Sequence, residues 1–471
     1  MERSLAPSRR PVGNVLVLTL GVAACCLATS PVRAQWTFVV LDPPGTNFSE
    51  CRRIRDGQQV GNATFGSVPH AALWSGTAAS FTDLHPAGQL QSQAFGVRAG
   101  RQVGNSYPLS FSHAGFWTGS AGSFVDLNPA GVTDSTAYDV AGNTMVGESS
   151  TGSYTSATLW NLASGSSTSL NPIGSSPPVT FSSISATDGL QQAGGVALAG
   201  TLHAALWSGT AASYVDLHPV AANSSYANDV HAGQQVGRAI FGFANHASLW
   251  TGSAASWVDL QPAAATLSEA SGVHQGEQVG TSTVYGLYPH ASLWSGSAAS
   301  WVDLHNFVPA AYTASQAFGI WHDVLGTTYV VGSVTQSGHT IAAMWIRTAP
   351  VWTDVGFAKN GVNGAPHLGG IGPLTPNSLN SLPLTNATPS ANSVFVIGVF
   401  GAYAPFLGGV LVPDPLIVLP LTIDPAGAVT FPLTVPAGLP AGLPVRFQHW
   451  IQDPVATFGF SASNGLLGIL Q

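Results

Sequence analysis

Five histidines and five aspartates occupy matching positions of a repeated sequence pattern, and both residue types can do chemistry. Neutral imidazole binds zinc or copper, so a ring of such histidines would suit a metal ion or an anionic ligand. The alternative is a structural hydrogen bond from each histidine to the aspartate that follows it, because a buried carboxylate needs a partner. One degenerate copy has lost both residues, with Ser156 and Ser169 in their places, as a bonded pair predicts. We therefore interpret as structural the residues His70, His113, His203, His246, His290, Asp83, Asp126, Asp216, Asp259 and Asp303.

Three histidines of a second set follow the fourth predicted strand of a repeat, and two more sit in other predicted loops. We expect these side chains to be exposed in loops, where a rigid scaffold usually presents its functional residues. They are the candidate binding residues His85, His218, His305, His231 and His274. The sequence predicts no catalytic residue, no metal site and no cofactor.

Aromatic residues also recur once per repeat and would suit sugar-stacking platforms or packing between repeats. Packing is the commoner role of such residues, so we assign it to them here. The tryptophans are Trp74, Trp117, Trp160, Trp207, Trp250, Trp294 and Trp345. The aromatic residues of the following strand are Phe81, Phe124, Tyr214, Trp257 and Trp301.

Linear signatures of catalysis are missing from the sequence. It contains no G-x-S-x-G elbow, no H-E-x-x-H helix, no P-loop and no EF-hand spacing. We therefore favour a non-enzymatic binding or scaffold protein for a carbohydrate or protein partner. The alternative is a hydrolase or lyase in a central channel, since such a site is assembled from separate repeats and leaves little linear signal.

The elements that must position these residues come from the repeat itself. Successive tryptophans lie 43, 43, 47, 43, 44 and 51 residues apart, and a Val-Gly pair precedes most of them. Each copy holds four short apolar segments separated by Gly, Ser, Asn or Pro, which is typical of strands rather than helices. Four strands in about 43 residues match one propeller blade. We predict an all-β fold in which residues 35–355 form a seven-bladed β-propeller, with a β-solenoid as the alternative.

The ends of the repeat region bear on whether the propeller closes. A segment around Phe38 matches a fourth strand that has no repeat before it, and it would complete the last blade. The segment from Trp352 to Val355 competes for the same place, and the sequence does not choose between them.

The pattern His-Ala-x-Leu/Phe-Trp-x-Gly, followed by aromatic-Val-Asp-Leu, resembles the HAF-type extracellular repeat family of bacterial secreted proteins. The copies at His70, His113, His203, His246 and His290 match it, whereas the copies around Trp160 and Trp345 have lost parts of it. The resemblance covers about residues 36–355. It implies export and a propeller-like array, and it implies no activity.

The tryptophan period stops after residue 355. We interpret residues 356–376 as a linker and predict a small β-sandwich over residues 377–471, because about six alternating apolar runs are separated by Pro/Gly turns.

Residues 1–34 resemble a signal peptide, with a basic start, an apolar run and a cleavage site after Ala34. The segment ending at Cys25 also resembles a lipobox, which would make the protein a lipoprotein. We expect a secreted or cell-surface protein with no transmembrane helix. The net charge of −8 and a single lysine exclude nucleic acid as a partner.

Overall fold

The computed structural model describes residues 36–172, 179–284 and 288–471. The predicted signal peptide, its predicted cleavage site after Ala34 and Cys25 lie outside these residues. Within them the chain is all-β apart from short 3-10 turns, and no helix there is long and apolar enough to cross a membrane. The 3-10 turns are η1 (Ala78–Ser80), η2 (Ala121–Ser123), η3 (Ala211–Ser213), η4 (Ala254–Ser256), η5 (Ala298–Ser300), η6 (Leu304–Phe307) and η7 (Thr457–Gly459).

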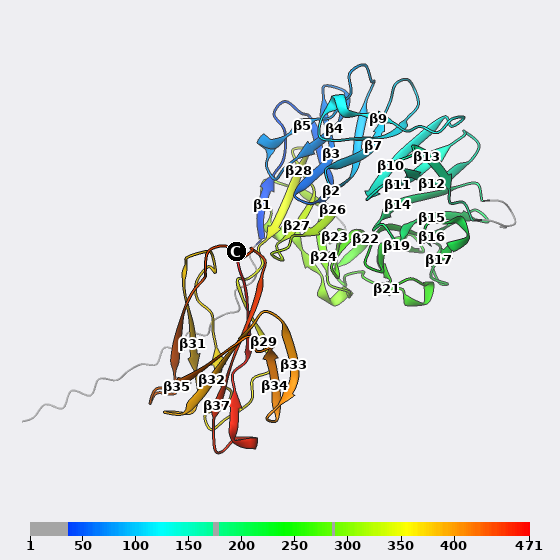
Figure 1. Cartoon of the computed structure of the whole chain (residues 1–471). Coiled ribbons are helices and arrows are strands. Elements are labelled where there is room, and N and C mark those ends of the chain that lie inside the picture. The colour runs from blue at the N-terminus through cyan, green and yellow to red at the C-terminus, as the bar shows by residue number, and fades with distance from the viewer. Residues whose placement is uncertain (1–35, 173–178, 285–287) are drawn as a thin grey trace, which may run out of the picture.

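The N-terminal region is a β-propeller, and its described residues form seven four-stranded antiparallel sheets (Figure 1). The innermost strands are β2 (Phe48–Arg55), β6 (Ser92–Arg98), β10 (Asp134–Ala141), β14 (Ser182–Thr187), β18 (Ser224–His231), β22 (Ala265–His274) and β26 (Ala314–His322). The second strands are β3 (Gln58–Phe65), β7 (Arg101–Ser106), β11 (Thr144–Ser150), β15 (Gln192–Leu198), β19 (Gln234–Phe241), β23 (Glu277–Val284) and β27 (Thr328–Gln336). The third strands are β4 (Val68–Trp74), β8 (His113–Trp117), β12 (Thr155–Asn161), β16 (Thr201–Trp207), β20 (Ala244–Trp250), β24 (Tyr288–Trp294) and β28 (His339–Arg347). The outer strands are β5 (Thr82–Asp83), β9 (Val125–Asp126), β13 (Ser166–Ser169), β17 (Val215–Asp216), β21 (Val258–Asp259), β25 (Val302–Asp303) and β1 (Trp36–Val40).

Strand β1 decides how the propeller closes. It pairs with β28 in the last sheet, with Phe38 opposite Trp345, so the N-terminal strand completes that blade. The competing segment at Trp352 pairs with a strand of the C-terminal region instead. Figure 1 shows blue β1 beside yellow-green β28.

One hydrogen bond recurs at every junction between neighbouring sheets. The backbone N–H of a buried alanine in the third strand donates to a serine hydroxyl in the innermost strand of the next blade. The last of these bonds runs from Ala342 to Ser49 at 2.9 Å, which joins the last blade to the first. The other six start at Ala71, Ala114, Ala157, Ala204, Ala247 and Ala291. The same hydrogen bond that joins the other neighbouring blades therefore also joins the last blade to the first and closes the ring.

The seven tryptophans pack between blades, as the sequence analysis proposed. Each has 0% of its surface exposed. Trp74 lies in a core with Val331 and Met344 of the neighbouring blade, and Trp117 lies with Val60 and Leu73 of its own neighbour. A buried indole cannot stack on a sugar, so these residues serve the scaffold.

The Val-Gly markers have a steric cause. Each glycine faces the innermost strand so closely that a Cβ added at Gly61 would collide with the carbonyl oxygen of Glu50. The same collision would occur at Gly104, Gly147, Gly194, Gly237, Gly280 and Gly332. The repeated glycine therefore allows the two inner strands to approach each other.

The C-terminal region has one large sheet, a smaller sheet and a hairpin. The large sheet contains β29 (Trp352–Gly356), β39 (Gly465–Ile469), β37 (Pro444–Gln452), β32 (Asn392–Gly398), β35 (Ile417–Thr422) and β38 (Phe460–Ala462). The small sheet contains β30 (His367–Leu368), β31 (Leu379–Thr385) and β36 (Val429–Thr434), and the hairpin is β33 (Gly401–Phe406) with β34 (Gly409–Pro413). Leu382 of the small sheet and Phe395 and Phe447 of the large sheet share one buried core, as in a β-sandwich.

Two boundaries differ from those expected. The segment 356–376 is not a free linker, because Lys359, Leu368 and Ile371 all form backbone hydrogen bonds inside the C-terminal region. That region begins at Trp352, within the range we assigned to the propeller.

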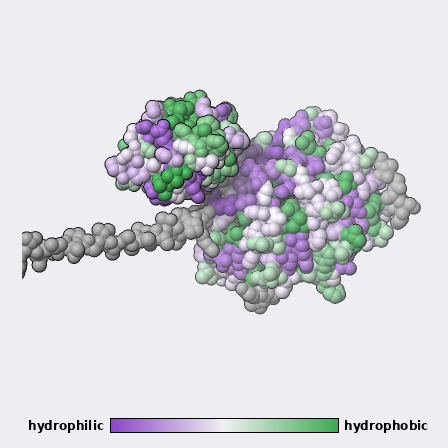
Figure 2. All heavy atoms as spheres, turned by 90° about the horizontal axis from the view of Figure 1, so that it is seen from below, coloured by the Kyte–Doolittle hydropathy of each residue, from purple (hydrophilic) through white to green (hydrophobic). Residues whose placement is uncertain are grey.

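The surface of the C-terminal region carries exposed apolar side chains. They include Leu379, Phe400 and Phe458, and Figure 2 shows green areas on the smaller of the two bodies.

Candidate functional site

Every innermost strand carries a β-bulge at the same place. In blade one the register shifts between Cys51 and Arg53, so Arg52 is the extra residue. A bulge bends the strand and re-aims the unpaired side chain. The equivalent residues of the other blades are Phe95, Tyr138, Ser185, Asn228, Ser271 and Phe318.

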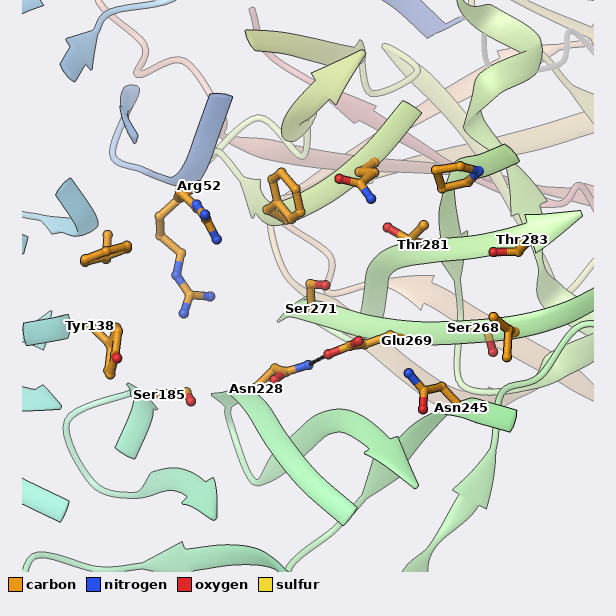
Figure 3. Close-up of a pocket in the computed structure, with 16 residues that line it drawn as sticks. Arg52, Tyr138, Ser185, Asn228, Asn245, Ser268, Glu269, Ser271, Thr281 and Thr283 are labelled. Atoms are coloured by element: carbon orange, nitrogen blue, oxygen red, sulfur yellow. Dashed lines mark hydrogen bonds between the residues drawn. The ribbon is translucent and has the colours of Figure 1, made fainter. Parts of the chain in front are cut away.

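These seven bulged residues all line one cavity of about 470 Å³ at the centre of the propeller. Each is half-buried, although the residue before it is buried in every blade. Figure 3 shows Arg52, Tyr138, Ser185, Asn228 and Ser271 coming from different blades around the same space. The cavity is the wide mouth of the central channel, and its chemistry is set by residues that differ from blade to blade.

One half of the wall is aromatic. The Arg52 guanidinium lies over the rings of Phe95 and Phe318, at 5.9 and 5.5 Å from their centroids. Phe95 in turn meets Tyr138 edge to face at 5.4 Å. Burial and the Glu148 carboxylate raise the pKa of Tyr138, so its hydroxyl keeps its proton and donates to Glu148 at 3.1 Å. We call Phe318, Arg52, Phe95 and Tyr138 the aromatic arc.

The other half is polar. The Asn228 amide donates to the Glu269 carboxylate at 2.8 Å (Figure 3). Arg238 binds the same oxygen at 2.6 Å. Ser185 and Ser271 add hydroxyl groups to this wall. We call Ser185, Asn228, Ser271 and Glu269 the polar arc.

The charges of the wide mouth are compensated. Arg52 pairs with Glu50 at 2.5 Å, and Arg238 pairs with Glu269. Titratable groups from different blades therefore meet here, as an enzyme would require. The described lining contains no histidine or cysteine, however, and its carboxylate is held by hydrogen bonds. The arrangement suits recognition of polar groups more than nucleophilic catalysis.

Below the wide mouth the channel narrows to a neck. Arg53 of blade one forms an ion pair with Asp229 of blade five at 2.9 Å, and Asp139 of blade three lies beside them. Burial raises the pKa of the Asp139 carboxyl, with Arg53 acting against the rise and Asp229 adding to it. The remaining space is about 20 Å³, room for little more than a water molecule. The ion pair therefore closes the channel between its two ends.

The five predicted His–Asp pairs are all present. The histidine Nδ1 lies 2.7–2.9 Å from the second carboxylate oxygen in each copy. The first oxygen accepts the backbone N–H two residues later, as at Asp83 and His85. Four of the five carboxylates are about 40% exposed or more, so the expected burial of the aspartates is wrong; only Asp303 is largely covered.

His85, His218 and His305 are half-buried, and our expectation of exposure is wrong for them. Their rings stack on the strand histidines at 4.0–4.3 Å. Each also bonds to the serine that joins neighbouring blades, as His85 does to Ser92 at 3.0 Å. Asn128 and Gln261 occupy the same place in other blades and bond the equivalent serines, which indicates a shared structural contact.

His231 and His274 are also placed differently from the prediction. They are the last residues of β18 and β22, not loop residues, and they lie side by side at the narrow end of the channel. Within the described chain, no group of three or more His, Cys, Asp or Glu residues is arranged to hold a metal ion.

The sequence analysis missed the bulged residues, although the signal was present. They stand inside a further repeated segment that precedes the Val-Gly pair, as in Ala94-Phe95-Gly96-Val97 and Asn228-Asp229-Val230. In this segment the residue before the bulge is small or apolar in every copy (Cys, Ala or Ile), whereas the bulged residue varies among Arg, Phe, Tyr, Ser and Asn. A residue that varies from copy to copy inside a repeated segment indicated a position that lines the cavity.

Fold and site together define the chain as a β-propeller protein with a C-terminal β-sandwich. No protein-family model and no curated protein matches it. Among solved structures it is similar to TolB from Acinetobacter baumannii, with 10% identity, a TM-score of 0.38 and coverage of 57% of this chain and 62% of that one. It is also similar to puromycin hydrolase, with 10% identity, a TM-score of 0.47 and coverage of 75% and 61%. The β-propeller domain of the trilobed protease from Pyrococcus furiosus has 8% identity, a TM-score of 0.43 and coverage of 64% and 96%. The chain thus spans less than two thirds of the first two proteins.

Proposed function

We propose that this is a secreted or cell-surface binding protein that holds a neutral carbohydrate at the wide mouth of the propeller channel. The observation that carries the proposal is the division of the wall into an aromatic arc and a polar arc. Ligand sites are typically apolar and aromatic surfaces with a few placed polar groups. A sugar ring has an apolar face and a rim of hydroxyls, so it matches both arcs at once.

The charge of the site favours a neutral ligand over an acidic or basic one. The Arg52 and Arg238 guanidinium groups both have carboxylate partners. An ionic ligand would have to break one of these pairs, whereas a hydroxyl group can share the Asn228 amide and the Glu269 carboxylate. Glu269 is already oriented by two donors, so little ordering is needed on binding.

A glycan-array screen of the purified protein, followed by calorimetry with a retained glycan, tests the proposal. We expect neutral glycans to be retained. Asn228→Ala and Phe318→Ala should each weaken binding about tenfold, roughly the loss of one good contact. Ser167→Ala is the control, since Ser167 is exposed on outer strand β13.

Three outcomes would contradict the proposal. In the first the array retains no glycan, and in the second it retains acidic glycans only. In the third outcome, Asn228→Ala and Phe318→Ala bind the glycan as tightly as the control Ser167→Ala. New reducing ends in the incubated glycan would instead support the hydrolase alternative. Urea unfolding of each variant separates a lost contact from a lost fold.

A further inference from the structure

The narrow end of the channel carries a second cluster of ionisable groups, which the proposed carbohydrate site does not use. It forms a rim from the last residues of the innermost strands. Arg55 ends β2, Arg98 ends β6, His231 ends β18, His274 ends β22 and His322 ends β26. The same strands that supply the bulged residues at the wide mouth thus supply a basic rim at the other end.

The two arginines of this rim have no carboxylate partner of their own. Arg52, Arg53, Arg238 and Arg347 each have a carboxylate partner. In the described chain, neither Arg55 nor Arg98 forms an ion pair; Arg98 donates only to the backbone carbonyl of Asp188, at 3.3 Å. Both guanidinium groups are half-buried beside the neck. Half-buried arginines without counterions are unusual unless a ligand supplies the charge.

Three carboxylates lie close to the rim, and all three already have hydrogen-bond partners. Glu277 binds His322 and Arg347, and Asp56 accepts the backbone N–H of Ala99 at 2.9 Å. The Asp188 side chain accepts backbone N–H groups from Leu190 and Gln191 through one oxygen and from Ala232 through the other. The Asp188 carboxylate thus accepts hydrogen bonds from its own loop and from the next blade. It therefore offsets part of the rim charge without pairing either arginine.

The histidines add neutral donors. Nδ1 of His274 lies 3.1 Å from the backbone nitrogen of His322 and 2.9 Å from its ring Nδ1, so the two histidines are held together, and a neutral imidazole keeps one N–H to donate. Burial, followed by the Arg55 guanidinium, lowers the pKa of His274 to about 2, and the same causes lower the pKa of His231. The buried Nδ1 of His231 has no hydrogen-bond partner in the structure. His322 itself is held by Glu277 at 2.9 Å.

We propose that the narrow end of the channel binds a small oxyanion, phosphate or sulfate, through Arg55 and Arg98 with His231 and His274 as neutral donors. Guanidinium groups bind such anions through paired, charge-assisted hydrogen bonds. The neck has no room for the anion to pass, so it binds at the rim. This site is separate from the carbohydrate site, because the Arg53–Asp229 pair lies between the two.

Isothermal titration of the full chain with sodium phosphate and with sodium sulfate, at constant ionic strength in a chloride buffer, tests the proposal. We expect saturable binding with one anion per chain. Arg55→Gln and Arg98→Gln should each weaken it at least about tenfold, and Arg55→Lys should weaken it less because it keeps the charge. Arg101→Gln is the matched control. Arg101 also lacks an ion pair and donates to Gly142 and Asn143, but it does not line the neck.

Absence of saturable phosphate or sulfate binding to the unmodified protein overturns the proposal without any variant. The proposal is also overturned if Arg55→Gln and Arg98→Gln bind the anion as tightly as the unmodified protein does and unfold at the same urea concentration. Stoichiometric zinc that is lost from His274→Gln overturns it as well, since the cluster would then be a metal site. The two sites fail separately: Asn228→Ala should leave phosphate binding unchanged, and Arg55→Gln should leave glycan binding unchanged.

Discussion

Removing the Arg53 guanidinium should strongly destabilise the propeller. Arg53 and Asp229 are 16% and 11% exposed and 2.9 Å apart. At an effective dielectric constant near 20 their attraction is about 6 kcal/mol before desolvation. Breaking a buried pair by deleting one partner typically costs about 3–5 kcal/mol, because the other charge stays buried. We expect Arg53→Met to lose about that much free energy of unfolding at pH 7.

The free energy of unfolding that Arg53→Met loses should depend on pH, and the pKa of Asp139 sets the direction. Burial already raises the pKa of Asp139 in the folded state. A raised folded-state pKa contributes stability that is present below the unfolded-state pKa and is lost as pH rises through the folded-state pKa. Arg53 acts against this rise, so without Arg53 the pKa of Asp139 should rise further. The deficit of Arg53→Met should therefore be largest at pH 7 and smaller at pH 4, by about 1.4 kcal/mol for each unit of added shift.

Urea unfolding at both pH values, followed by tryptophan fluorescence, measures these differences. Arg101→Met is the control, since Arg101 forms no ion pair in the described chain and makes only exposed hydrogen bonds to Gly142 and Asn143, so its loss should cost less than about 1 kcal/mol. Asp229→Asn and the double variant complete a cycle whose coupling energy reports the pair itself. A deficit for Arg53→Met below 1 kcal/mol, or one that is the same at pH 4 and pH 7, would refute the reasoning.

Two further predictions concern other histidines. Burial lowers the pKa of His449 to about 3 from 6.5; the unfolded state takes up a proton first, so the C-terminal domain should be about 2 kcal/mol less stable at pH 5 than at pH 8. His449→Gln should remove this slope in urea unfolding, and an unchanged slope would disprove the assignment. His246→Ala should cost about 0.5–1 kcal/mol through its bond to the half-exposed Asp259, with no change in bound metal by elemental analysis. Zinc or copper lost with that change would contradict a structural role.

Local rules explain why the scaffold was predictable. Blade packing needs the same buried indole in every copy, and the close approach of two strands needs the same glycine, as at Trp74 and Gly61. Such residues repeat because their neighbours repeat. The His–Asp bond is also local, since both partners lie in one hairpin.

The sequence by itself determined the propeller repeat, the buried tryptophans, the five His–Asp pairs and the sandwich-like C-terminal region. Only the tertiary structure decided that Phe38, not Trp352, belongs to the last blade, and that one bulged residue per blade reaches a shared cavity. It also joined Arg53 to Asp229 and gathered Arg55, Arg98, His231 and His274 into one rim. The physical reason is ring closure: it brings inner strands from all seven repeats around one axis, and no pattern within a single repeat records that meeting.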